Sequence, residues 1–426
     1  MKVVFFADNR NRDNWGCRAT STALKDMVRE HADIIYTIDG TFTHVYRPLH
    51  LRDRIYSLSD RIRMALYRRG LFTQKIKDND PYNIIKETVA DSYIAYRRMI
   101  NNKPLSYYQK IDEMLRQCDA LVCNGEGTAI FTNPPRYDSI FYALIFKLAQ
   151  EYGKKTYYLN AVFSDCPETG RNTKTLNEFK DIFLQCTKVT ARDPLSYQYY
   201  LENIGNNAIY VPDALFSWTK YSDYLPLAKT TPRVIVPFPE YDEVIEKYDF
   251  RKPYVCLSGS SFAAWTQQEA CNSYIKLALA LKEHYNVYIV PTCIGDRFLE
   301  RVANVSGCPL IPVHTNIYFG MSILANADIF ISGRWHPSIL ASIGGTPCVF
   351  LGSNSHKTTA LQHMLNYAEI KEYNAIPTDE DVSNILKDCQ NILSSPNYMQ
   401  LRNKIRSTSE SLSKDSLLQF MTTDVS

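Results

Sequence analysis

The sequence predicts an α/β protein with two Rossmann-like domains that face a central cleft, followed by C-terminal helices. Short apolar segments alternate with segments of helical length and pattern along most of the chain, which is typical of parallel sheets covered by helices on both faces. A proline-rich stretch at residues 219–252 interrupts this alternation and predicts a linker. The length of 426 residues also favours two domains over one.

The first half of the chain supplies six expected strands and three expected helices. The expected strands are Val3–Ala7, Asp33–Ile38, Ala120–Cys123, Thr156–Val162, Lys188–Ala191 and Ala208–Val211. The expected helices are Cys17–Glu30, Tyr82–Ile100 and Tyr137–Tyr152. Glycine predicts a turn at Asn14–Gly16 and a loop at Asn124–Thr128.

The second half repeats the alternation. Its expected strands are Tyr254–Leu257, Val287–Pro291, Asp328–Ser332 and Cys348–Leu351. Its expected helices are Gln267–His284, Tyr318–Ala325, Pro337–Ile343, one from Thr358 and polar helices after Asp379. We therefore predict an N-terminal domain over 1–218 with a helical insertion at 41–110, a C-terminal domain over 253–378 and helices over 379–426.

Composition excludes several classes of protein. With 45% hydrophobic and 22% charged residues, the chain is neither a disordered polymer nor a coiled coil or collagen. No run approaches the ~18 apolar residues of a membrane helix. The start, Met1–Asp8, turns polar too soon for a signal peptide. Eleven cysteines without a CxxC pair favour reduced thiols in the cytoplasm over disulfides or a zinc site.

The charge is unevenly distributed. A net charge of +3 is too small to indicate a nucleic-acid partner, but Arg47–Lys77 holds nine Lys or Arg and two Asp, which is 9 − 2 = +7. Apolar residues at helical spacing within it predict a basic amphipathic helix. Such a helix can lie on an anionic membrane surface or bind a pyrophosphate group. It can also pack against the rest of the protein with its basic face in solvent.

The loops that follow strands carry the candidate chemistry. Ser332–Pro337 follows an apolar strand and begins a helix, so its peptide N–H groups, Arg334 and His336 can together bind an anion and move a proton. Arg192 ends another strand, just before Asp193 and Pro194, which fit the start of a helix. A helix cap or a packing residue is the plainer interpretation of His336, and an ordinary surface arginine is the plainer interpretation of Arg192.

Two further loops supply possible ligands for an anion. Ser260 belongs to a Ser- and Gly-bearing loop after the strand at Tyr254–Leu257, and Lys357 follows His356 after the strand at Cys348–Leu351. Neither loop contains a dinucleotide-binding or P-loop motif, and a helix start explains His356–Lys357 equally well. These side chains are candidates because ligands bind beyond the carboxyl ends of strands in open α/β sheets.

The stretches Arg192–Ser196 with Val211–Ala214, and Ser332–His336 with Ala341, Gly345 and Pro347, resemble motifs of the polysaccharide pyruvyl transferase family. Asn124–Gly127 is similar to a degenerate form of the family's glycine triplet. The resemblance implies a GT-B-like fold and transfer of the pyruvyl group of phosphoenolpyruvate to a sugar of a cell-surface polysaccharide, which forms a pyruvate ketal and releases phosphate. It implies that no metal or nucleotide is needed.

The resemblance also implies roles for single residues. Arg192 and Arg334 would bind the phosphate and carboxylate of the donor, with Ser260 and Lys357 beside them, and His336 would be the acid–base residue. We expect the first domain to bind the acceptor, which is a sugar of the polysaccharide or of its lipid-linked precursor; a lipid-linked precursor would place the chain at the inner face of a bacterial membrane. Asn14, Glu126, Asn160 and Asp165 are the candidates for this role, because they lie at or beyond strand ends.

Two other functions remain open. One is a GT-B glycosyltransferase that uses a nucleotide sugar, although the stretch Ser338–Pro347 lacks the glutamate with which many such enzymes hold the donor's ribose. The other is a carbohydrate-binding protein without catalysis, which would bind glycans and release no phosphate from any donor.

Overall fold

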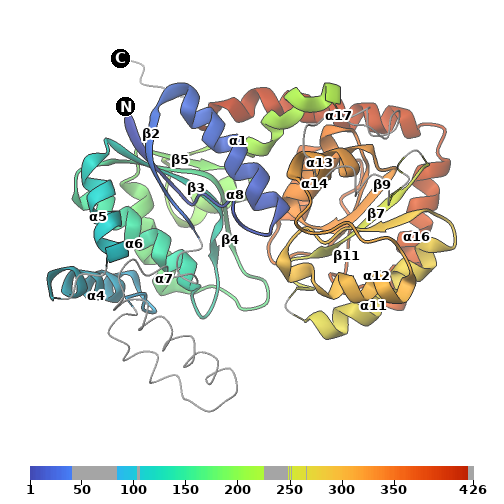
Figure 1. Ribbon diagram of the computed structural model, residues 1–426, viewed down its shortest axis with the longest axis horizontal. Helices are drawn as coiled ribbons and strands as arrows, with labels where there is room; N and C mark the ends of the chain where they lie inside the picture. Colours follow the sequence, from blue (N-terminus) through green and yellow to red (C-terminus); the bar gives the residue numbers. More distant parts are fainter. Residues whose placement is uncertain are drawn as a thin grey trace, which may run out of the picture. The chain divides into compact units, whose positions relative to one another are not determined.

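A computed structural model describes residues 1–40, 84–102, 106–224, 248, 250, 252–264 and 266–420. They form two compact units, each built on its own parallel sheet (Figure 1). Unit 1 comprises Met1–Asn9, Lys25–Arg192 and Ser196–Tyr210; unit 2 comprises Arg10–Leu24, Asp193–Leu195 and Val211–Ser426. The predicted α/β class is confirmed.

Unit 1 contains a parallel sheet with the strand order β2-β1-β3-β4-β5-β6. Its strands are β1 (Lys2–Phe6), β2 (Asp33–Ile38), β3 (Ala120–Phe131), β4 (Lys155–Asp165), β5 (Lys188–Ala191) and β6 (Ala208–Tyr210). Its helices are α4 (Val89–Asn102), α5 (Ser106–Gln117), α6 (Tyr137–Glu151), α7 (Thr173–Leu184) and most of α8 (Pro194–Asn203). Helix α1 (Trp15–His31) belongs to unit 2 up to Leu24 and to unit 1 from Lys25.

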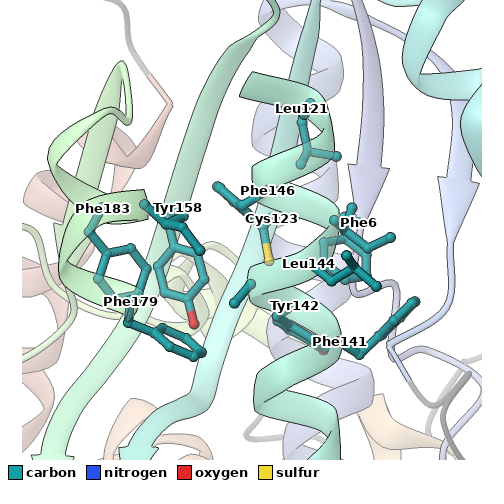
Figure 2. Packing of buried hydrophobic residues seen from close by; sticks show 14 of the residues in the cluster. Phe6, Leu121, Cys123, Phe141, Tyr142, Leu144, Phe146, Tyr158, Phe179 and Phe183 are labelled. Carbon is teal, nitrogen blue, oxygen red and sulfur yellow. The ribbon is translucent and has the colours of Figure 1, made fainter. Parts of the chain in front are cut away.

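Aromatic side chains fill the core of unit 1 between the sheet and the helices α6 and α7. Figure 2 shows Tyr158 of β4 close to Phe183 of α7, and their ring centroids lie 4.7 Å apart. Phe6 of β1 contacts Phe141 of α6 edge to face at 5.6 Å. Each buried aromatic ring removes a large apolar area from water, so this core stabilises the sheet whose edge carries the polar residues described below.

The predicted loop at Asn124–Thr128 is wrong, because β3 continues through these residues to Phe131. The strand is irregular there: Glu126 has a left-handed φ of 42°, and the register with β4 shifts between Glu126 and Ala129. A Cβ at Gly125 would lie 2.7 Å from the Tyr158 ring, so close strand packing, not a loop, requires this glycine.

Unit 2 contains a second parallel sheet, with the strand order β11-β10-β9-β7-β8. Its strands are β7 (Val255–Ser260), β8 (Val287–Ile289), β9 (Ile329–Gly333), β10 (Cys348–Leu351) and β11 (Glu372–Tyr373). Its helices are α11 (Gln267–Lys282), α12 (Phe298–Ser306), α13 (Ile317–Asn326), α14 (Trp335–Ile343), α15 (Lys357–Met364), α16 (Asp379–Ser394) and α17 (Tyr398–Ser416), with short 3-10 helices η1 (Ala214–Tyr224), η2 (Ile294–Asp296) and η3 (Leu417–Gln419). Figure 1 shows α13 and α14 on one face of this sheet and α11 and α12 on the other.

The segment Arg10–Leu24 lies in unit 2 because its side chains bond to the loop before α13. The indole Nε1 of Trp15 donates to the carbonyl of Val313 at 2.7 Å, and the Arg18 guanidinium donates to the carbonyls of Val313 and Thr315. Gly320 of α13 approaches the Trp15 ring so closely that a Cβ there would lie 2.6 Å from it. The start of α1 is thus held against the second sheet's helices.

The two sheets share the same topology. Numbered within each unit, the strands follow the order 2-1-3-4-5, with a sixth strand added in unit 1. In this arrangement the second strand lies on one side of the first and the later strands lie on the other side, so the direction of strand addition reverses between the first and third strands. Ligands bind beyond the carboxyl ends of these two strands in such sheets. The expected positions are therefore the ends of β1 and β3 in unit 1, and of β7 and β9 in unit 2.

Some predictions fall outside the described residues. The basic segment Arg47–Lys77 is one of them. Within the predicted linker, residues 219–224 belong to η1, and residues 225–247 are not described. In the part of the chain that is described, none of the helices combines the length and the apolar character needed to cross a bilayer.

Candidate active site

The site in unit 2 lies where the chain leaves β7 and β9, at the reversal of strand order. The last residues of these strands, Ser260 and Gly333, pair with each other after a register shift that follows Leu257. A Cβ at Gly333 would lie 2.4 Å from the Cβ of Ser260, so only glycine permits this approach. The next residue of each loop, Ser261 and Arg334, is thereby placed at the same edge of the sheet.

Two cations meet at Ser261. The Nζ of Lys357, at the start of α15, donates to Ser261 Oγ at 2.8 Å and to Asn354 Oδ1 at 2.7 Å. Arg334 Nη1 lies 3.5 Å from the same Ser261 oxygen. The predicted residue Ser260 instead points into the turn, where its Oγ accepts from the backbone N–H of Ala263. The structure therefore places Ser261, which sequence reasoning missed, between the two cations.

A buried carboxylate holds Arg334. Its Nη2 lies 2.5 Å from Oδ1 of Asp296, which is completely buried and also accepts from the backbone N–H of Thr292. Burial by itself lowers the pKa of a guanidinium, but the negative charge of Asp296 outweighs this and raises the pKa of Arg334. Arg334 Nε is buried and makes no hydrogen bond within the described residues. The ion pair thus holds the charged guanidinium of Arg334 in place and leaves its Nε–H as a hydrogen-bond donor.

A second buried carboxylate orients His336. Its Nε2 lies 3.2 Å from Oδ2 of Asp213, which also accepts from the indole Nε1 of Trp335 at 2.8 Å. The other oxygen, Oδ1, accepts from Thr20 Oγ1 at 3.1 Å and from the backbone N–H of Leu215 at 2.9 Å. Asp213 is completely buried and saturated with donors, so it is a fixed anchor for the imidazole.

Gly16 packs against the opposite side of that imidazole. A Cβ built on Gly16 would lie 2.5 Å from Nδ1 of His336 and 2.8 Å from its Cβ. Any other residue at this position would displace the ring or take the space beside Nδ1. Asn14, predicted as an acceptor ligand, instead caps α1: its Oδ1 accepts from the backbone N–H of Cys17 at 3.0 Å.

In unit 1, polar side chains gather at the corresponding edge of the first sheet. Glu126 Oε1 accepts from Asn9 Nδ2 at 2.7 Å and from Asn124 Nδ2 at 3.0 Å. Asn160 donates to Asn124 Oδ1 at 3.1 Å, which extends the network from β1 through β3 to β4. Asn160 and Glu126 both have left-handed backbones, with φ of 58° and 42°. Strained residues of this kind persist where the surrounding structure fixes them, often at functional sites.

Arg192 follows β5 at the same edge, next to this network. It is only 3% exposed, and its backbone N–H donates to the carbonyl of Ala161, the residue after Asn160. It is therefore not a surface arginine. Asp165, in contrast, lies at the far end of β4, where it binds Arg171 and accepts from Tyr199. The structure brings Glu126, Asn160 and Arg192 together, and it separates Asp165 from them. Glu126 and Asn160 lie within β3 and β4 and not at or beyond the strand ends as predicted, because both strands continue past them.

Comparison with known sequences identifies one family. The sequence model described as polysaccharide pyruvyl transferase matches residues 17–355. That range includes Arg192, Arg334, His336 and the buried carboxylates Asp213 and Asp296. A search of curated proteins found no match.

Comparison with solved structures shows a shared fold across nearly the whole chain. A UDP-GlcNAc 2-epimerase from Neisseria meningitidis, bound to UDP-GlcNAc, has a TM-score of 0.52 at 12% identity and covers 98% of this chain and 100% of its own. The same enzyme from Methanocaldococcus jannaschii, with UDP-GlcNAc and UDP, has a TM-score of 0.53 at 11% identity, covering 97% and 99%. Anabaena HepE with UDP and glucose has a TM-score of 0.51 at 12% identity, covering 98% and 96%. The predicted GT-B-like fold is confirmed; at such identities the likeness shows the fold alone.

Proposed function

Because the chain belongs to the polysaccharide pyruvyl transferase family, we propose that it transfers the pyruvyl group of phosphoenolpyruvate to a sugar of a cell-surface polysaccharide or of its lipid-linked precursor. The product is a pyruvate ketal, and phosphate is released. The observation that supports this most is the pair of cations, Arg334 and Lys357, that meet at Ser261 where the strand order of unit 2 reverses.

The charge of this site fits a small and highly charged donor. Near neutral pH, phosphoenolpyruvate carries about three negative charges on its phosphate and carboxylate. Arg334 and Lys357 supply two positive charges, and α14 and α15 begin beside them with N-terminal N–H groups that favour anions. The buried Nε of Arg334 is a further donor for a ligand oxygen. We assign the third cation to Arg192 of unit 1.

His336 is the proposed acid. Because Nε2 faces Asp213, we assign the transferred proton to Nδ1. The imidazolium gives its proton to the methylene carbon of phosphoenolpyruvate while a sugar hydroxyl attacks the central carbon. Help of this kind from a positioned acid accelerates a reaction ~10²–10⁴-fold.

For the acceptor we propose Glu126 and Asn160 of unit 1 as ligands of the sugar hydroxyls, because their network lies at the reversal of strand order in that sheet. Asn14 and Asp165 are engaged elsewhere, in capping α1 and in binding Arg171.

A lipid-linked acceptor would give the basic segment Arg47–Lys77 a role at an anionic membrane surface, since each basic residue near such a surface contributes ~1 kcal/mol. Reversing the charge of Arg61, Arg63, Arg68 and Arg69 should abolish binding to anionic liposomes at low salt. Failure of the wild-type chain to bind anionic liposomes at low salt would contradict this role.

The experiment that tests the function is release of phosphate from phosphoenolpyruvate over a panel of galactosyl, mannosyl and glucosaminyl acceptors, with EDTA present because the proposal needs no metal. We expect release with at least one acceptor, and an increase in melting temperature with phosphoenolpyruvate alone. A shift with UDP-GlcNAc but none with phosphoenolpyruvate would instead favour a nucleotide-sugar glycosyltransferase. Glycan binding without phosphate release from any donor would favour a non-catalytic binding protein.

A further inference from the structure

Unit 2 contains a second histidine held by a buried carboxylate. Nε2 of His356 lies 3.2 Å from Oδ1 of Asp193, which is completely buried, while the His356 side chain remains 24% exposed. His356 is the residue before α15, but its side chain makes no capping hydrogen bond to that helix. Its contact with Asp193 is therefore not explained by helix capping.

This pair repeats the arrangement around His336. Strands β9 and β10 are adjacent and parallel, so the loops after them leave the same edge of the sheet about 4.8 Å apart. Each loop holds one cation and one histidine: Arg334 with His336 after β9, and Lys357 with His356 after β10. Both cations reach Ser261, and each histidine is bound by its own buried aspartate.

The proposed reaction needs two groups that move protons. A proton must be added to the methylene carbon while the attacking hydroxyl loses one. A single imidazole cannot be the protonated donor and the neutral acceptor in the same step. We therefore propose, building on the function proposed above, that His356 is the second proton-transfer residue and accepts the proton of the attacking sugar hydroxyl.

The protons and bonds then balance. In the addition step, His336 gives a proton to the methylene carbon, the hydroxyl oxygen bonds to the central carbon, and His356 takes the hydroxyl proton. In the second step the bond between the central carbon and the phosphate oxygen breaks, and His356 returns its proton to the departing phosphate. The second hydroxyl bonds to the central carbon and gives its proton to His336. Both histidines return to their starting states, and no oxidant or further reactant is required.

Asp193 has a positioning role in this scheme. Its carboxylate lies 3.2 Å from Nε2 of His356 and so fixes the orientation of the imidazole. Asp193 also belongs to the short segment Asp193–Leu195, which groups with unit 2 although Arg192 before it groups with unit 1.

The test compares three variants in the phosphate-release assay. We expect His356→Gln to lower kcat at least ~10²-fold with a KM for phosphoenolpyruvate within about threefold of wild type. We expect His356→Ala to show the same loss and to recover activity when imidazole is added, since the partly exposed side chain leaves room for it. The matched control is His363→Gln, an exposed histidine in the last turn of the same helix, which should keep the wild-type kcat.

The outcomes separate this inference from the proposed function. If the wild type releases phosphate and His356→Gln keeps its kcat, His356 has no part in proton transfer and the proposed function stands. A loss in His356→Ala that imidazole does not restore, together with a lowered melting temperature, would show a structural role and also overturn the inference. Asp193→Asn should lower kcat less than His356→Gln does, and should move the pH at which kcat is half-maximal. A wild type that neither binds phosphoenolpyruvate nor releases phosphate overturns both.

Discussion

The guanidinium of Arg334 lies 2.5 Å from the carboxylate of Asp296, and that carboxylate has no exposure to solvent. An arginine in this setting cannot swing away as a surface arginine does, so a donor would meet a charge that is already in place. The ion pair also ties the loop after β9 to η2, which contains Asp296. Activity and stability should therefore both depend on it.

The first prediction concerns the stability of this pair. Arg334→Ala leaves the Asp296 charge buried without its partner, so we expect the free energy of unfolding to fall by ~3–5 kcal/mol. Asp296→Ala should cost a similar amount, and the double variant should cost clearly less than the sum. The control is Lys276→Ala, which removes one partner of the exposed pair Lys276–Asp379. We expect it to lower the free energy of unfolding by less than ~1 kcal/mol. Urea denaturation measures all four variants, and additive effects at Arg334 and Asp296 would contradict the coupling.

The second prediction concerns Gly16, the glycine beside the proposed acid His336. Gly16→Ala places a methyl group 2.5 Å from His336 Nδ1, so the ring must move away from its position on Asp213. We expect kcat to fall at least ~10-fold while calorimetry shows little change in affinity for phosphoenolpyruvate. At Gly127 a Cβ would meet only Ile130, at 3.4 Å, so Gly127→Ala is a control for the stability cost of the substitution. A normal kcat in Gly16→Ala would show that this contact does not matter.

The third prediction concerns the acid and its anchor. His336→Ala should lower turnover at least ~10²-fold with little loss of donor affinity, because in the proposed reaction the imidazole moves a proton and the cations bind the donor. Asp213→Asn keeps the shape of the anchor but replaces one acceptor oxygen with an amide, so the imidazole is held less well and kcat should fall by less than in His336→Ala. Steady-state kinetics across pH measures both. Near-normal turnover in His336→Ala removes this residue from the mechanism.

The fourth prediction concerns the thiols. All eleven cysteines are free and buried. Burial raises the pKa of Cys293 to about 11 and that of Cys186 to about 12. A raised pKa keeps the thiol protonated up to a higher pH, so at pH 8 only about one Cys293 in a thousand is the reactive thiolate. We expect a thiol reagent to label the folded chain very slowly at pH 8 and to count eleven thiols in urea. Rapid labelling of several cysteines in the folded chain would contradict this.

Elements bounded by clear turn residues were predictable from the sequence. The strands Lys188–Ala191 and Cys348–Leu351 were predicted with the bounds that the structure shows, because the first ends before Arg192-Asp193-Pro194 and the second lies between a proline and a glycine. Asn124–Thr128 was predicted wrongly, because its glycines were interpreted as loop residues. They instead allow β3 to pack closely against β4 and to pass through a left-handed residue.

The candidate site was predictable only in its cations and its histidine. Arg334 and His336 stand together in the sequence after a strand, so their chemistry was visible. Their carboxylate partners were not. Asp296 lies in no motif, and Asp213, although it belongs to the motif-like stretch Val211–Ala214, gave no sign in the sequence that it contacts His336. Ser261 was missed in favour of Ser260 because the direction of a side chain at a strand's end depends on the local turn. Gly16 looked like a turn glycine, although its contact is with His336.

The most direct test of the central claim is calorimetric titration of phosphoenolpyruvate into the wild type and into Arg192→Gln, Arg334→Gln and Lys357→Gln. We predict binding to the wild type and a loss of affinity of at least ~10-fold in each variant, since each removes a charge-assisted contact to the donor. Unchanged affinity in both arginine variants, or binding of UDP-GlcNAc in place of phosphoenolpyruvate, would contradict it.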